Sequence, residues 1–126
     1  MPEPPHNTGG GLFEIEPLGE TIILIPFADL PELEYERIEA EARHILDLLN
    51  DGRIKNVVID FHRTDYYAST ALIFFMRLWT RVKRGNGLMA FCNLSDHEKE
   101  ILQVTKLDRL WPICESREQA LQAVRA

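Results

Sequence analysis

Three polar residues near the middle of the chain have the side chains of a serine hydrolase: Asp60, His62 and Ser69. A Ser-His-Asp triad needs an imidazole that hydrogen-bonds both the hydroxyl and the carboxylate, and it is recognised by that geometry rather than by sequence spacing. The Gly-x-Ser-x-Gly turn that presents such a nucleophile is absent from the sequence. Hydrolysis through Ser69 is therefore an alternative for a serine-directed covalent probe to test, and we expect the chain not to be an enzyme.

Metal and cofactor chemistry have no support in the sequence. The four histidines, at positions 6, 44, 62 and 97, include no pair at metal-ligand spacing. There is no Cys-x-x-Cys motif and no glycine-rich phosphate-binding loop. Cys92 and Cys114 are predicted to be small buried side chains on strands, as free cysteines usually are. We expect no metal and no cofactor.

Two adjacent hydroxyls, Ser69 and Thr70, begin a predicted helix that follows a buried strand. The strand is the apolar, β-branched run from Asn56 to Phe61. Functional sites of open α/β sheets lie at the carboxyl ends of the strands, which places the candidate site between Asp60 and Leu72. Serine here is also a favoured N-cap, which needs no regulatory purpose. A phosphate on it would add about −1.5 to −2 charges at a helix N-terminus, where N–H groups and the dipole favour anions.

The helix from about Ser69 to Arg84 has one apolar stripe that predicts its buried face. Ile73 and Phe74 lie off this stripe, beside the hydroxyls, and are either a docking surface or covered by another element. Tyr66 and Tyr67, in the preceding loop, either line the same surface or are buried beneath the loop. The stripe consists of Leu72, Phe75, Met76, Trp79 and Val82.

The rest of the chain alternates strand and helix patterns. The order strand-strand-helix-strand-helix-strand-helix-strand-helix predicts an α/β fold with a mixed, mainly parallel five-stranded sheet. Short right-handed crossovers would place its four or so helices mostly on one side. The further strands are predicted around Phe13 to Ile15, at Thr21 to Ile25, Leu88 to Asn93 and Trp111 to Cys114. The further helices are predicted at Pro31 to Asn50, from Ser95 with Glu98 as its capping-box partner, and from Ser116 to Arg125.

Composition predicts one small acidic domain. With 126 residues, 45% of them hydrophobic, the chain can bury one core. Residues 1–11 hold three prolines and three glycines and are predicted to be a disordered tail, which leaves 12–126 as the domain. The net charge of −6 argues against nucleic acid as a partner. Neither a transmembrane run nor a signal peptide is recognisable, so we expect a cytoplasmic protein that does not bind membranes.

The segment from Val57 to Leu72 resembles the central segment of STAS domains, the fold of bacterial anti-sigma-factor antagonists. In that family a strand ending in Asp leads to Asp-Ser-Ser-Gly at a helix start, and the first serine is phosphorylated. The matching residues are Ala68-Ser69-Thr70-Ala71, so Ser69 takes the place of the phosphorylated serine and Thr70 is the second candidate. Ala68 and Ala71 stand where the family has Asp and Gly. The resemblance continues through Gly85 to Cys92, Ile101 to Leu110 and Glu115 to Leu121.

The resemblance implies an anti-sigma-factor antagonist that binds a kinase-type anti-sigma factor and is switched by phosphorylation at Ser69. The partner would supply the phosphoryl chemistry, a phosphatase would reverse it, and a weak homodimer is compatible with the family. Because Ala68 removes the carboxylate beside the hydroxyl, the alternative is a STAS-type scaffold or sensor module that binds a protein or small ligand without being phosphorylated. The expected partner-binding residues are Asp65, Tyr66, Tyr67, Ala68, Ser69, Thr70, Ile73, Phe74 and Arg77.

Overall fold

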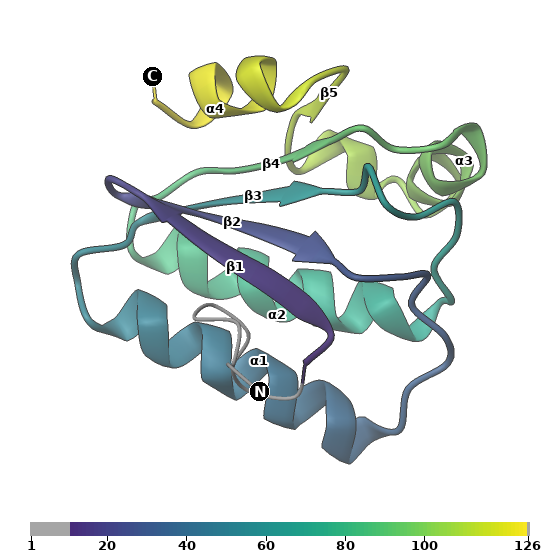
Figure 1. Ribbon diagram of the computed structural model, residues 1–126, viewed down its shortest axis with the longest axis horizontal. Coiled ribbons are helices and arrows are strands. Elements are labelled where there is room, and N and C mark those ends of the chain that lie inside the picture. Colours follow the sequence, from purple (N-terminus) through teal and green to yellow (C-terminus); the bar gives the residue numbers. More distant parts are fainter. Residues whose placement is uncertain (1–10, 126) are drawn as a thin grey trace, which may run out of the picture.

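The structure, a computed structural model, describes residues 11–125 as a five-stranded sheet with helices on both of its faces (Figure 1). The strands lie in the order β1-β2-β3-β4-β5; β1 and β2 are antiparallel and the other neighbours are parallel. This confirms the predicted mixed, mainly parallel sheet. The elements are β1 (Phe13–Leu18), β2 (Thr21–Pro26), α1 (Tyr35–Asn50), β3 (Asn56–Asp60), α2 (Thr70–Arg84), β4 (Met89–Cys92), α3 (Asp96–Val104), the 3-10 helix η1 (Leu107–Arg109), β5 (Ile113–Cys114) and α4 (Arg117–Arg125).

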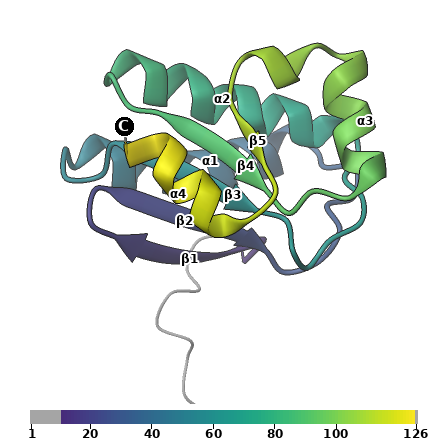
Figure 2. The ribbon, with the colours of Figure 1, turned by 90° about the horizontal axis from the view of Figure 1, so that it is seen from above.

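The two faces of the sheet carry different helices. α1 and α2 lie side by side beneath the sheet, α3 lies beyond its end, and α4 alone crosses the opposite face (Figures 1 and 2). The larger core cluster therefore joins the sheet to α1, α2 and Leu102 of α3, while a smaller cluster lies under α4. β2 and β3, covered on both faces, are buried along nearly their whole length, as their continuous apolar sequences predict.

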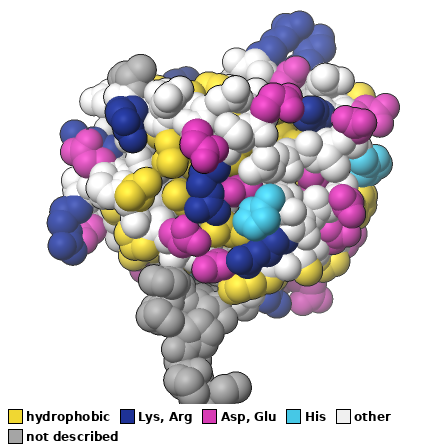
Figure 3. All heavy atoms as spheres, turned by 45° about the horizontal axis from the view of Figure 1, so that its top comes forward, with side chains coloured by type: hydrophobic (Ala, Val, Ile, Leu, Met, Phe, Trp, Pro, Cys, Tyr) yellow, Lys and Arg dark blue, Asp and Glu magenta, His cyan; other side chains and the backbone are white. Residues whose placement is uncertain are grey.

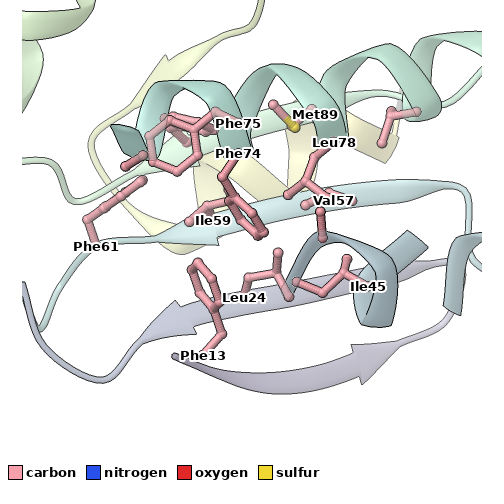
Figure 4. Packing of buried hydrophobic residues seen from close by; sticks show 14 of the residues in the cluster. Phe13, Leu24, Ile45, Val57, Ile59, Phe61, Phe74, Phe75, Leu78 and Met89 are labelled. Carbon is pink, nitrogen blue, oxygen red and sulfur yellow. The ribbon is translucent and has the colours of Figure 1, made fainter. Parts of the chain in front are cut away.

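An aromatic cluster attaches α2 to the sheet. The Phe75 ring contacts the rings of Phe61, Tyr67 and Phe91 at centroid distances of 5.8, 5.3 and 5.0 Å. Phe74 faces the sheet beside it and stacks on Phe13 at 5.0 Å (Figure 4). The loop that follows β3 is therefore packed directly against the first turns of α2.

Two details of the helices differ from the prediction. α1 begins at Tyr35 rather than Pro31, because Leu30 pairs with Tyr67 of the loop after β3 and the Leu33 N–H is bound to Thr70 of α2. The buried face of α2 is also rotated relative to the predicted stripe, since α2 packs against α1 as well as the sheet. Its buried residues are Ala71, Phe74, Phe75, Leu78 and Val82, whereas Leu72, Met76 and Trp79 are partly buried.

The predicted capping box of α3 is confirmed. The Ser95 hydroxyl accepts from the Glu98 N–H, and the Glu98 carboxylate accepts from the Ser95 N–H. Of the predicted tail, residues 1–10 lie outside the described residues. Within residues 11–125, no helix has both the length and the apolar character needed to cross a bilayer.

Candidate functional site

Ser69 lies exposed immediately before α2, at the carboxyl end of β3. It does not cap the helix, so the N-cap interpretation of Ser69 was wrong. Its backbone is already helical, with φ −61° and ψ −27°, and its Oγ donates to Glu32 Oε2 at 3.4 Å. The neighbouring hydroxyl, on half-buried Thr70, accepts from the Leu33 N–H at 2.9 Å. Of the two candidate hydroxyls, Ser69 is therefore the more accessible.

The loop that carries Ser69 is held by the connection between β2 and α1. Asp29 Oδ1 accepts from the backbone N–H groups of Asp65 at 2.9 Å and Tyr66 at 3.4 Å. Leu30 pairs with Tyr67 in a parallel bridge, and its C=O accepts from the Ala68 N–H at 2.8 Å. These contacts join segments that are 36 or more residues apart in the sequence. Sequence reasoning missed Asp29 and Glu32, because no local pattern relates them to Ser69.

Beneath the loop, α3 supplies a buried carboxylate. Glu98 accepts from the Thr64 hydroxyl at 2.5 Å, and its backbone C=O accepts from the Tyr67 hydroxyl at 2.8 Å. Burial raises the pKa of Glu98, and the hydrogen bonds from Thr64 and Ser95 offset only part of that rise. Burial, together with the nearby Glu98 charge, also raises the pKa of Tyr67, which keeps its phenol a donor. The underside of the loop is thus buried and holds the loop in place.

The structure corrects the expected contact surface at three positions. The side chains of Tyr67, Ala68 and Phe74 are buried, with exposed fractions of 0, 1 and 2%. Tyr67 packs into the aromatic cluster, Ala68 lies against Leu30, and Phe74 of α2 stacks on Phe13 of β1. Their side chains belong to the core and cannot form part of a surface that meets a partner.

The remaining predicted residues do reach the surface around Ser69. Tyr66 and Ile73 are 41% and 47% exposed, and Asp65 is exposed as well. Tyr66 stacks on His97 of α3, with the ring centroids 5.3 Å apart. Arg77 is half-buried and forms an ion pair with Glu39 of α1. Beyond Ile73, a shallow apolar groove follows α2, lined by Leu72, Ile73, Met76, Arg77 and Thr80.

The proposed hydrolytic triad is not assembled. His62 Nδ1 lies 3.1 Å from Asp60 Oδ1, but the Ser69 hydroxyl bonds to Glu32 instead of to the imidazole. Without a base on the hydroxyl, the three residues lack the geometry of a triad. Within residues 11–125, no group of three or more His, Cys, Asp or Glu side chains is placed to hold a metal ion.

Asp60 instead forms a buried polar junction between β3 and α4. Its carboxylate accepts from Asn93 Nδ2 and from Arg117 Nε, each at 2.9 Å, and from the His62 N–H at 3.1 Å. Arg117 also binds Glu16 of β1 at 3.1 Å. Burial raises the pKa of Asp60, but the hydrogen bonds from Asn93, Arg117 and His62 together lower it by more than burial raises it. The pKa of Asp60 therefore lies below the ordinary value. This junction fixes the backbone at which the loop toward Ser69 begins.

Charges of both signs alternate over the face that carries α4 (Figure 3). That view shows no broad basic patch of the kind that binds a phosphate backbone. The fold and the site thus define a small α/β domain that presents an exposed serine on a loop packed rigidly from below.

The STAS domain family model matches residues 31–120, and the chain belongs to this family. BtrV of Bordetella bronchiseptica, whose name places it with the anti-sigma factor antagonists, is 28% identical over 90 residues, covering 71% of this chain and 74% of BtrV.

Solved structures agree with the fold. The Thermotoga maritima protein TM1081 superimposes with a TM-score of 0.78 at 20% identity, covering 90% of this chain and 95% of its own. The unphosphorylated anti-sigma factor antagonist SpoIIAA does so with a TM-score of 0.75 at 18% identity, covering 90% and 96%. At these identities the likeness establishes the fold alone.

Proposed function

We propose that this STAS domain is an anti-sigma-factor antagonist that binds a kinase-type anti-sigma factor through the surface around Ser69. Phosphorylation of Ser69 by that ATP-using partner ends the binding, and a phosphatase restores it. The observation that carries the proposal is the exposed Ser69 hydroxyl on a loop braced by Asp29, Leu30 and Glu98. SpoIIAA, which shares the fold, has been solved in both unphosphorylated and phosphorylated forms. The chain itself catalyses nothing and acts in the cytoplasm.

The surface around Ser69 suits a partner that packs apolar groups against it. Exposed Ile73 and Tyr66 supply apolar area, and the carboxylates of Asp65 and Glu32 lie at its edge. A phosphate at Ser69 would add about −1.5 to −2 charges and three acceptor oxygens beside these groups. A partner surface that is complementary to unmodified Ser69 cannot accommodate the volume and charge of the phosphate, so the partner no longer binds.

Ser69→Ala tests the modification. We expect phosphate on Ser69 when the protein is incubated with ATP and lysate of its own source, and none at this position in the variant. Thr70→Ala is the matched control, because it removes the neighbouring, half-buried hydroxyl and should leave the Ser69 phosphate in place. Mass spectrometry locates the phosphate. No phosphate on either residue, with a kinase-type anti-sigma factor present in the lysate, would contradict the switch.

A second candidate function has an observation in its favour. Ala68 is buried and carries no carboxylate, so the position before Ser69 cannot orient the hydroxyl for a kinase. A scaffold or sensor module of the same fold would bind its partner without being modified. Stable capture of the partner in the presence of ATP, with no phosphate incorporated, is the result that favours this reading.

Ile73→Asp tests the contact surface. We expect the variant to weaken binding of the anti-sigma factor by about 2 kcal/mol, roughly thirtyfold, because an apolar anchor becomes a charge in the interface. The free energy of unfolding should change by only about 0.5 kcal/mol, since Ile73 is 47% exposed. Val104→Asp is the matched control, because Val104 is 75% exposed at the far end of α3. If titration calorimetry gives equal affinities for the two variants, Ile73 does not lie in the interface with the partner.

A further inference from the structure

The position of Glu32 gives Ser69 a second role that rests on the proposed function. Glu32 lies in the connection between β2 and α1, and its carboxylate accepts from the Ser69 hydroxyl at 3.4 Å. The contact is attractive only while Ser69 carries a proton on Oγ. Replacing that proton by a phosphate puts two anionic groups at the same place, so the contact becomes a repulsion.

The start of α2 offers the phosphate fewer free N–H groups than an ordinary helix N-terminus. Two of its first amide groups are already used, since the Ala71 N–H donates to the Ala68 C=O and the Leu72 N–H donates to the Ser69 C=O, each at 3.0 Å. We expected free N–H groups at this helix end to bind the phosphate. These two amides are not available for that role. Acidic side chains, in contrast, lie on both sides of the loop, with Asp29 bound to the backbone of Asp65.

The connection can respond locally because its firmest anchors, Asp29 and Leu30, both precede residues 31–34. Leu30 is 2% exposed and is tied to the loop by its bond to the Ala68 N–H, so it acts as the fixed end. After Leu30 the chain is exposed at Pro31, Glu32 and Glu34. Leu33 between them is partly buried against the core, and its N–H donates to the Thr70 hydroxyl, which attaches this stretch to the start of α2.

We infer that phosphorylation of Ser69 releases residues 31–34 from the start of α2 through repulsion of Glu32, so that the modification remodels a neighbouring part of the surface. The released stretch leads into α1, whose first residue, Tyr35, is 65% exposed. A partner would then detect two changes, the phosphate itself and the displaced acidic stretch beside it.

Amide hydrogen exchange in the isolated protein tests this inference without a kinase or a partner. Phosphoserine is incorporated at position 69 during synthesis, and exchange is followed residue by residue by NMR. We expect the Leu33 amide to exchange about tenfold faster, which corresponds to about 1.4 kcal/mol. The Ala68 amide, bonded to the anchor Leu30, and the Phe91 amide, bonded to Pro112 in the sheet, should keep their rates.

Two variants assign the effect to Glu32. Glu32→Gln should abolish most of the acceleration at Leu33, because it removes the charge and keeps the size of the side chain. Glu34→Gln is the matched control, since it neutralises an exposed glutamate of the same stretch whose side chain makes no capping bond. The acceleration should also shrink at high salt, which screens exposed charges.

An unchanged Leu33 exchange rate in the phosphoserine protein would overturn the inference, and so would an acceleration that persists in Glu32→Gln. Either result leaves the proposed function standing, because phosphate can block a partner directly. Failure of the proposed function has a different signature, which is partner binding that is indifferent to the phosphate.

Discussion

Replacing Phe75 by alanine is expected to lower the free energy of unfolding by about 3–5 kcal/mol, the largest effect of any substitution considered. Phe75 is completely buried and its ring lies among those of Phe61, Tyr67 and Phe91. Truncation removes the transfer free energy of the ring and leaves a cavity, because the neighbouring rings on β4 and on the loop after β3 cannot all close in on it.

Urea unfolding followed by circular dichroism measures this loss. Phe75→Leu should cost less than half as much, because leucine fills most of the space. Ile73→Ala, on the exposed side of the same helix, should cost little and controls for helix propensity. A loss below about 1 kcal/mol for Phe75→Ala would show that the cluster does not hold α2 against the sheet. Because Tyr67 belongs to the cluster, the alanine variant should also loosen the loop that presents Ser69.

Removing Arg117 is expected to lower the free energy of unfolding by about 2–3 kcal/mol at neutral pH. Breaking a fully buried ion pair costs roughly 3–5 kcal/mol, because the remaining charge stays buried. The cost is smaller here for two reasons: the Arg117 side chain is 30% exposed, and the Asp60 carboxylate keeps its bonds to Asn93 and the His62 N–H. Arg125→Ala is the matched control, since it removes an exposed arginine from the last turn of the same helix.

The contribution of this junction depends on pH in a defined direction. The pKa of Asp60 in the folded protein lies below its ordinary value of 3.8, so the stabilisation is present above that value and is lost as the pH falls through the folded pKa. The difference in unfolding free energy between the wild type and Arg117→Ala should therefore be full at neutral pH and shrink well below pH 3.8. A difference that stays constant into strong acid would show that Arg117 acts through packing instead of through the Asp60 charge.

The contribution of Glu98 to the free energy of unfolding changes with pH in the opposite direction. Its pKa is raised, so its ionised form is the costly one and its contribution to stability falls as the pH rises through the folded pKa. The comparison between wild type and Arg117→Ala separates the two carboxylates, because Glu98 is present in both proteins and its effect cancels.

Much of the local structure follows from residues that are close in sequence. The apolar, β-branched run at β3 predicts a buried strand, and the Ser95–Glu98 spacing predicts the capping box, because each depends on hydrogen bonds or burial patterns within a few residues. The position of Ser69 at the carboxyl end of a strand follows in the same way. These signals, together with the STAS resemblance, were enough to predict the order of strands and helices along the chain and the candidate hydroxyl.

Which face of α2 is buried could not be predicted from local sequence signals alone. Leu72 and Phe74 both lie near the boundary of the apolar stripe, and periodicity alone does not decide which of them faces the core. Phe74 is buried because Phe13 of β1 lies opposite it, while Leu72 is partly exposed. The neighbour that decides the matter is brought there by the sheet, not by the helix sequence.

The amino-acid sequence by itself determined the class of fold, the order of the elements and the presence of an exposed serine where a buried strand meets a helix. Only the tertiary structure decided what surrounds that serine: Glu32 on its hydroxyl, Asp29 under its loop, and Arg117 on the carboxylate of Asp60. The physical reason is the range of the interactions. Strand and helix patterns arise from neighbouring residues, whereas these three contacts join segments 37, 36 and 57 residues apart, and such contacts exist only once the sheet has brought the segments together.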